Sequence, residues 1–159
     1  MKYNTYIFDL DGTLLDTLQD LANAVNYAMR EMNYPERTVD EVRRFIGNGI
    51  RMLIKRAVPQ DISSEDYDKT LAVFTAYYLD HIADCTRPYS GITDVIKSLK
   101  SHGCKTAVVS NKADEAAKKV VADFFGDIFD LVVGKMDCFP SKPAPDSVLY
   151  VIKALEADK

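Results

Sequence analysis

Apolar positions recur with two different spacings along this chain. The run Tyr6-Ile7-Phe8 predicts a buried strand over residues 4–9. Apolar residues spaced three and four apart then predict only helices between residues 16 and 84, with Asp16 as the first N-cap and Thr38 as the second. These helices are expected at about 17–33, from Thr38 to about Phe45, at Ile50–Ala57, and over Tyr67–Ile82.

From Arg87 onward, predicted helices and strands alternate. We expect, in order, a helix at Ile92–Leu99, a strand at Thr106–Val109, a helix at 116–124, a strand at Phe129–Val133 and a helix at Ser147–Ala157. Such alternation predicts an α/β fold with a Rossmann-like parallel sheet and right-handed crossovers. The predicted domains are therefore an α/β core of residues 1–15 and 85–159, and an inserted all-helical domain of residues 16–84.

The amino-acid composition and net charge limit the kinds of molecule that this protein is expected to bind. The 159 residues are 47% hydrophobic and 28% charged, which is typical of a soluble globular protein. A net charge of −4 argues against nucleic acid or a membrane surface as the partner, and no apolar run reaches membrane-spanning length. Three cysteines without close pairing, together with an N-terminus that runs straight into the first strand, favour a reduced, cytoplasmic protein.

Residues with reactive or charged side chains follow three of the predicted strands. Asp9 and Asp11 come where the first strand ends, Ser110 comes at the end of the second, and Lys142 lies in the loop after the third. Ligands of open parallel sheets bind beyond the carboxyl ends of the strands, so these side chains are expected to converge on one crevice. His81 and His102 are far apart and show no zinc-ligand spacing.

This set of side chains favours phosphoryl transfer. One carboxylate can act as a nucleophile, and the second can protonate a leaving group and later activate water. Gly12 and Thr13 suit a tight turn that aims backbone N–H groups and a hydroxyl at an anion, and Lys142 supplies fixed positive charge. Two carboxylates beside a phosphate repel one another, so a divalent cation is expected, with Mg²⁺ as the ion that favours such oxygen ligands.

At these residues the chain resembles the haloacid dehalogenase superfamily, and in particular its phosphoglycolate-phosphatase-like branch. Asp9–Thr13 match the family's first motif, which holds the nucleophile and the acid/base, and the Asp at position 11 favours a phosphatase over a dehalogenase. Ser110-Asn111 match the second, phosphate-binding motif, and Lys142 with Pro143 matches the third. The resemblance implies a magnesium-dependent phosphatase of a small phosphorylated metabolite, with Asp9 and Asp11 at the metal.

The resemblance extends to the inserted helices. Residues 16–84 resemble the family's small helical cap, and Gly47-Asn48-Gly49 with Arg51 resemble the cap loop that faces the substrate. We therefore expect Gly47, Gly49 and Arg51 to contribute to substrate binding. A phosphosugar mutase of the same superfamily would use the same aspartyl-phosphate, and this alternative stays open.

One motif of the family has no match. The fourth motif is a further strand that ends in Gly-Asp and completes the metal site, whereas this sequence stops at Asp158-Lys159. Neither Asp137 nor Asp146 is expected to replace it. A second alternative is therefore a catalytically impaired fragment that binds phosphate or serves as an interaction module. Because the unmatched strand lies beside the first strand in the family's sheet, we expect strand 4–9 to be an exposed edge, through which two copies pair.

Overall fold

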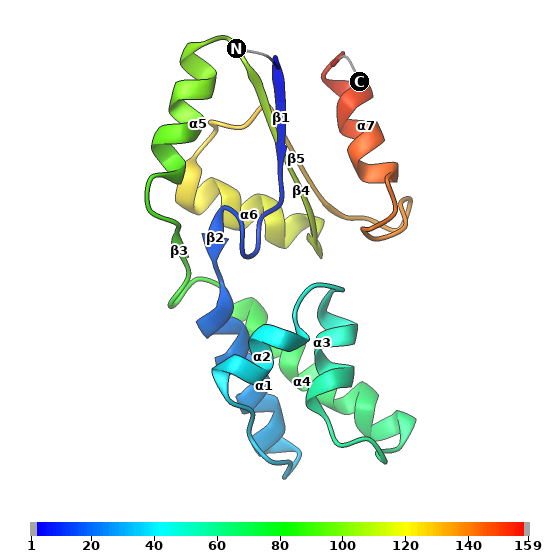
Figure 1. Cartoon of the computed structure of the whole chain (residues 1–159). Coiled ribbons are helices and arrows are strands. Elements are labelled where there is room, and N and C mark those ends of the chain that lie inside the picture. The colour runs from blue at the N-terminus through cyan, green and yellow to red at the C-terminus, as the bar shows by residue number, and fades with distance from the viewer. Residues whose placement is uncertain (1–2, 158–159) are drawn as a thin grey trace. The chain divides into compact units, whose positions relative to one another are not determined.

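The chain folds into two compact units (Figure 1). The computed structural model describes residues 3–157. Unit 2 is Thr17–Thr86, and unit 1 consists of the described residues up to Asp16 and from Arg87 onward. The two crossings between the units lie within two residues of the predicted boundaries at 16 and 84.

The three-stranded sheet of unit 1 is parallel throughout. It consists of β1 (Thr5–Phe8), β4 (Lys105–Ala113) and β5 (Leu131–Lys135), in the order β1-β4-β5. Thr5 pairs with Lys105, and Ala107 with Leu131. The predicted α/β fold with a parallel sheet is confirmed, and β1 forms one edge of the sheet among the described residues.

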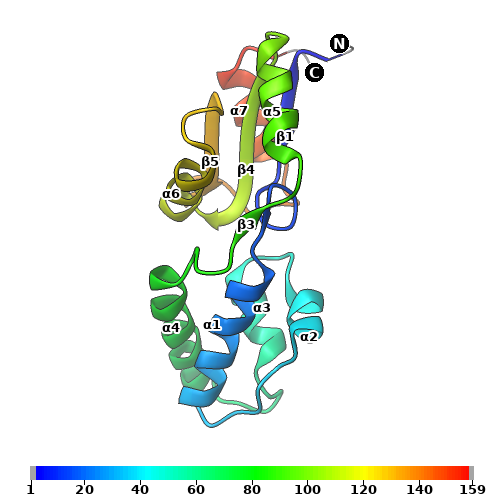
Figure 2. The ribbon, with the colours of Figure 1, turned by 90° about the vertical axis from the view of Figure 1, so that its left-hand side faces the viewer.

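Helices cover both faces of this sheet. In Figures 1 and 2, α5 (Ile92–Ser101) and α6 (Asp114–Phe125) lie on one side and α7 (Asp146–Ala154) on the other. Because β4 is covered on both faces, its residues 106–110 are all buried, which explains the continuous apolar run in the sequence. The core beneath α7 consists of Ala107, Val109, Val133 and Val151.

Unit 1 also contains a short pair of antiparallel strands. They lie where the chain leaves unit 1 and where it returns. β2 (Leu15–Asp16) pairs with β3 (Arg87–Pro88), a contact that the sequence analysis did not predict. The prediction of Asp16 as the N-cap of the first helix is wrong for this reason. Pairing with Arg87 keeps Asp16 in an extended strand, and the helix begins at Leu18 after an N-cap, Thr17, whose side chain makes no capping bond.

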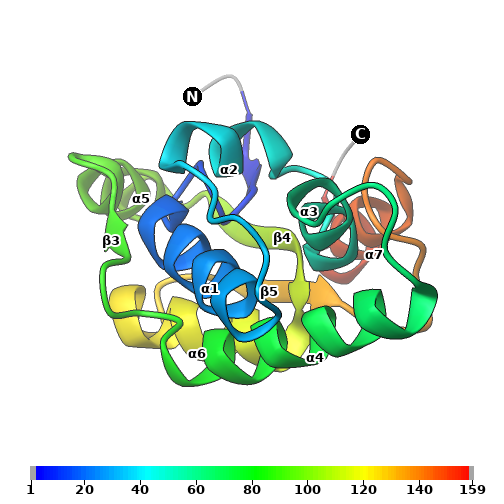
Figure 3. The same ribbon diagram turned by 90° about the horizontal axis from the view of Figure 1, so that it is seen from below.

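Unit 2 is entirely helical, as predicted. Its helices are α1 (Leu18–Glu31), α2 (Val39–Phe45), α3 (Ile50–Ala57) and α4 (Ser64–Asp80). α1 lies alongside α4 and also contacts α2, as Figure 3 shows. The predicted cap at Thr38 is confirmed, because its hydroxyl accepts from the Glu41 N–H while the Glu41 carboxylate accepts from the Thr38 N–H. No helix among residues 3–157 is long and apolar enough to cross a membrane.

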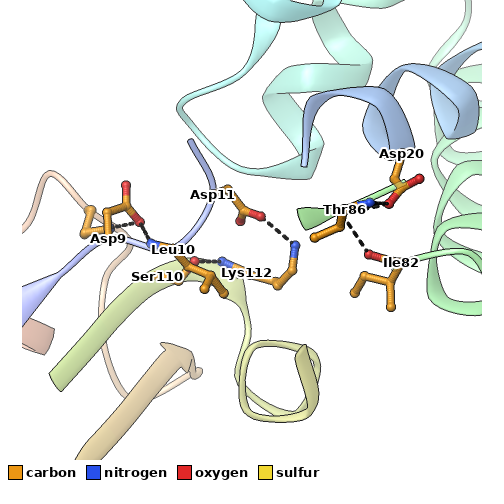
Figure 4. A network of polar contacts seen from close by, with 9 residues as sticks. Asp9, Leu10, Asp11, Asp20, Ile82, Thr86, Ser110 and Lys112 are labelled. Carbon is orange, nitrogen blue, oxygen red and sulfur yellow. Dashed lines mark hydrogen bonds and ion pairs between the residues drawn. The ribbon is translucent and has the colours of Figure 1, made fainter. Parts of the chain in front are cut away.

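A buried carboxylate ties together the two ends of unit 2. Asp20 in α1 is only 2% exposed. Its Oδ1 accepts from the Cys85 N–H at 2.8 Å, and its Oδ2 accepts from the Thr86 N–H at 2.8 Å and from the Thr86 hydroxyl at 2.7 Å. Figure 4 shows the Thr86 contacts. Three donors compensate the cost of burying this charge, so the entering and leaving segments of unit 2 are held side by side.

Candidate active site

A tight turn follows β1 and places the two acidic residues. The Leu10 carbonyl accepts from the N–H groups of Thr13, Leu14 and Leu15, and the Gly12 N–H donates to the Leu15 carbonyl at 2.8 Å. Gly12 has φ +78, a conformation that L side chains rarely adopt. The turn itself uses the N–H groups of Gly12 and Thr13. Substrate binding at Gly12 and Thr13 stays a prediction. The Thr13 side chain is exposed.

Lys142 reaches the first of the two acids. Its Nζ donates to Asp9 Oδ1 at 2.7 Å and to the Val109 carbonyl at 2.6 Å. Asp9 Oδ1 also accepts from the Leu10 N–H at 2.8 Å, and the carboxylate remains 48% exposed. The structure therefore brings together a carboxylate and an amine that are 133 residues apart in the sequence.

Asn111 fixes the loop that carries this lysine. Its Oδ1 accepts from the Lys142 N–H at 2.8 Å, and its Nδ2 donates to the Lys142 carbonyl at 3.1 Å. Both polar atoms of the amide thus bind the backbone of Lys142, which makes Asn111 a support for the amine. Ser110 is buried beside it in β4.

The sequence analysis missed one charged residue of this site. Lys112 is only 7% exposed, and its Nζ lies 3.0 Å from Asp11 Oδ1. Its backbone N–H donates to the Ser110 hydroxyl at 3.1 Å (Figure 4). The predicted strand ends at Val109, whereas β4 continues to Ala113. The spacing of two between Ser110 and Lys112 is the sequence signal that places both on one face of a longer strand.

The four charged groups of the site balance one another. Asp9 pairs with Lys142, and Asp11 pairs with Lys112. Among residues 3–157, no group of three or more His, Cys, Asp or Glu side chains is arranged to hold a metal ion. Mg²⁺ commonly uses only one or two carboxylates together with phosphate oxygens and waters. The donors present therefore fit Mg²⁺ once a phosphate supplies further oxygens.

The predicted substrate loop belongs to unit 2. Gly47 and Gly49 lie between α2 and α3 with φ +126 and +80. Arg56 holds this loop, since its guanidinium donates to the Phe45 carbonyl at 2.6 Å and to Asn48 Oδ1 at 2.9 Å. Arg51 is an exposed residue of α3. Its contribution to substrate binding, like that of Gly47 and Gly49, stays a prediction.

The site combines paired acids after the first strand of a parallel sheet with a lysine that returns to them from a late loop. These features are typical of a class of hydrolases. The family model of haloacid dehalogenase-like hydrolases matches residues 6–159, and the chain belongs to this family. The phosphoglycolate phosphatase of Aquifex aeolicus is 37% identical over 150 residues, which cover 94% of this chain and 68% of that protein. Phosphoglycolate phosphatase 1 of Pseudomonas aeruginosa is 33% identical over 92% of this chain, but the match covers only 56% of its own length.

Solved structures agree with this assignment. A structure from Lactobacillus delbrueckii subsp. bulgaricus superposes with a TM-score of 0.94 at 34% identity, and the match covers 99% of this chain and 75% of that one. A structure from Haemophilus somnus, described as a predicted phosphoglycolate phosphatase, has a TM-score of 0.91 at 27% identity, covering 99% and 73%. The chain thus spans between about half and three quarters of the length of these relatives.

Proposed function

We propose that this chain is the catalytic part of a phosphatase that hydrolyses a small phosphorylated metabolite of the phosphoglycolate kind. The observation that carries the proposal is the contact of 2.7 Å between Lys142 Nζ and the carboxylate of Asp9. This contact supports the proposal because it puts a positive charge beside the partly exposed Asp9 carboxylate, and such a charge stabilises a phosphoryl group during its transfer to that carboxylate. The names of the relatives support the same activity.

In the proposed reaction, a carboxylate oxygen of Asp9 attacks phosphorus and the bond from phosphorus to the alcohol oxygen breaks. Asp11 gives the departing alcohol its proton, and the phosphoryl group stays on Asp9 as an aspartyl-phosphate. Asp11 then takes a proton from the water that hydrolyses this intermediate. Lys142 stabilises the charge in both steps, and Asn111 serves them by fixing the Lys142 backbone. The hydroxyls of Thr13 and Ser110 are the proposed donors to phosphate oxygens.

Mg²⁺ is the proposed cofactor, and the Asp9 carboxylate and the main-chain carbonyl of Asp11 are its proposed ligands. Because the two lysines already balance the two carboxylates, a bound phosphate adds uncompensated negative charge to the site. A divalent cation offsets this charge and weakens the repulsion between substrate and nucleophile. Binding of the rest of the substrate is assigned to Gly47, Gly49 and Arg51.

The test is phosphate release from 2-phosphoglycolate with Mg²⁺ and with a chelator. We expect Asp9→Asn to lower kcat at least about a thousandfold, because it removes the nucleophile. Asp94→Asn, which changes an exposed carboxylate of α5, is the matched control and should keep wild-type turnover. Hydrolysis that persists in the Asp9 variant contradicts the nucleophile assignment.

The same assay separates the alternatives. A phosphosugar mutase returns the phosphoryl group to a sugar hydroxyl, so it yields an isomeric phosphosugar and little inorganic phosphate. A fragment that only binds phosphate gives neither product, while phosphate still perturbs it in a binding measurement.

We also propose a cytoplasmic location, since Cys85, Cys104 and Cys138 form no disulfide.

A further inference from the structure

Lys112 is a buried, positively charged residue that has no role in the proposed reaction steps. Its side chain is only 5% exposed, and burying an ammonium group is costly unless a partner compensates it. The Asp11 carboxylate lies at 3.0 Å and supplies that compensation. Within residues 3–157, no other polar group binds this carboxylate, so Lys112 determines where it lies.

The backbone around Lys112 is built to hold this position. Its N–H donates to the buried Ser110 hydroxyl at 3.1 Å. The neighbouring strand β5 approaches β4 closely here, because a Cβ added at Gly134 in β5 would come within 2.7 Å of the Lys112 carbonyl oxygen. A lysine on so constrained a backbone presents its amine at a defined place. Asp11, by contrast, lies in a turn, where Lys112 is the one partner of its side chain among residues 3–157.

We propose that Lys112 is a positioning residue that holds the Asp11 carboxyl group where it delivers a proton to the leaving alcohol. The inference rests on the proposed function and refines it. An alkyl alcohol leaves only with a proton, whereas a nitrophenolate leaves without one. In the first step, which kcat/KM reports, a group that positions Asp11 as the acid therefore matters for alkyl phosphates and hardly for nitrophenyl phosphate, whereas hydrolysis of the aspartyl-phosphate is the same for both substrates. A group that acts on the phosphoryl charge matters equally for both.

The experiment measures kcat and KM for 2-phosphoglycolate and for 4-nitrophenyl phosphate in four proteins. These are the wild type, Lys112→Met, Lys112→Arg and the control Lys119→Met, which removes an exposed lysine of α6. We expect Lys112→Met to lose about a hundredfold in kcat/KM on phosphoglycolate and less than about threefold in kcat/KM on the nitrophenyl ester. Lys112→Arg should recover much of the loss, because it keeps a cationic donor.

An equal loss of kcat/KM on both substrates, or no loss on either, overturns the proposal. Thermal melting of each variant excludes simple unfolding as the cause of a loss. If the wild-type chain hydrolyses neither substrate, the proposed function fails, and crystal structures of wild type and Lys112→Met still decide the positioning role. An Asp11 side chain that leaves its wild-type position in the Met variant supports the role, and one that stays in place overturns it.

Discussion

The two lysines of the site, Lys142 and Lys112, show which contacts between residues can be predicted from a sequence. Lys142 and Asp9 were expected to meet because both follow strands of one parallel sheet, and their side chains do lie 2.7 Å apart. Lys112 was not expected in the site. The register of β4 against β5 is irregular between Val109 and Ala113. The spacing of two between Ser110 and Lys112 indicates a longer strand, but it does not reveal this irregularity.

Gly134 is the residue on which this close approach depends. A Cβ at this position would lie 2.4 Å from the Asp114 Cα and 2.7 Å from the Lys112 carbonyl oxygen, and neither backbone atom can rotate away. We expect Gly134→Ala to lower the free energy of unfolding by about 2–3 kcal/mol, measured by urea denaturation. It should also reduce turnover, because the displaced backbone carries Lys112.

The control for this prediction is Gly103→Ala. Gly103 has φ +74 and nothing within 4 Å of the added Cβ, so its substitution costs only the backbone strain of about 1 kcal/mol. If Gly134→Ala costs no more than Gly103→Ala, the two strands tolerate the extra atom and the close approach is not a constraint.

At the scale of elements, helices were more predictable than short strands. The helical spacing of apolar residues located all four helices of unit 2, because each buries one face against its neighbours. The two-residue strands β2 and β3 have no periodicity to detect, and their pairing also displaced the first helix start from the predicted N-cap at Asp16. Long-range pairing therefore overrode a plausible local capping signal.

Asp130 joins three elements of unit 1 just before β5. Its Oδ1 accepts from Lys100 of α5 at 2.6 Å, and its Oδ2 accepts from the Thr106 N–H of β4 at 2.7 Å. Burial raises the pKa of this carboxyl, but the hydrogen bonds from Lys100 and Thr106 and the charge of Lys100 outweigh it and leave the pKa below its ordinary value. The folded protein thus binds this proton less readily than the unfolded chain does.

A depressed pKa gives a stabilisation that is present above about pH 4 and disappears as the pH falls through the folded value. We expect Asp130→Asn to lower the free energy of unfolding by about 1 kcal/mol at pH 7, and by clearly less near pH 3, in urea denaturation. Asp123→Asn, at an exposed pair of 3.6 Å with Lys119, should change little at either pH. A cost for the Asp130 variant that is the same at both pH values contradicts this reasoning.

Within the part of the chain that the structure describes, the parallel sheet has an edge that is open to pairing. β1 lies at the end of the order β1-β4-β5 among the described residues, and all four of its residues are only partly buried. The Lys105 N–H donates to the Asn4 carbonyl, so in a parallel ladder Asn4 and Tyr6 bond to β4 while the backbone groups of Thr5 and Ile7 face away. Unpaired edge groups of this kind recruit another strand.

We therefore expect two copies to associate through β1, and Thr5→Pro to prevent it, since proline removes an outward N–H at the first residue of the strand, where the sheet tolerates it. Thr5→Val is the matched control, because it changes the same side chain and keeps the N–H. Sedimentation velocity over a range of concentrations should show a dimer for the wild type and the valine variant, and a monomer for the proline variant. Because the edge depends on backbone groups alone, a wild-type monomer at every concentration, or a proline variant that still dimerises, rules out β1 as the interface.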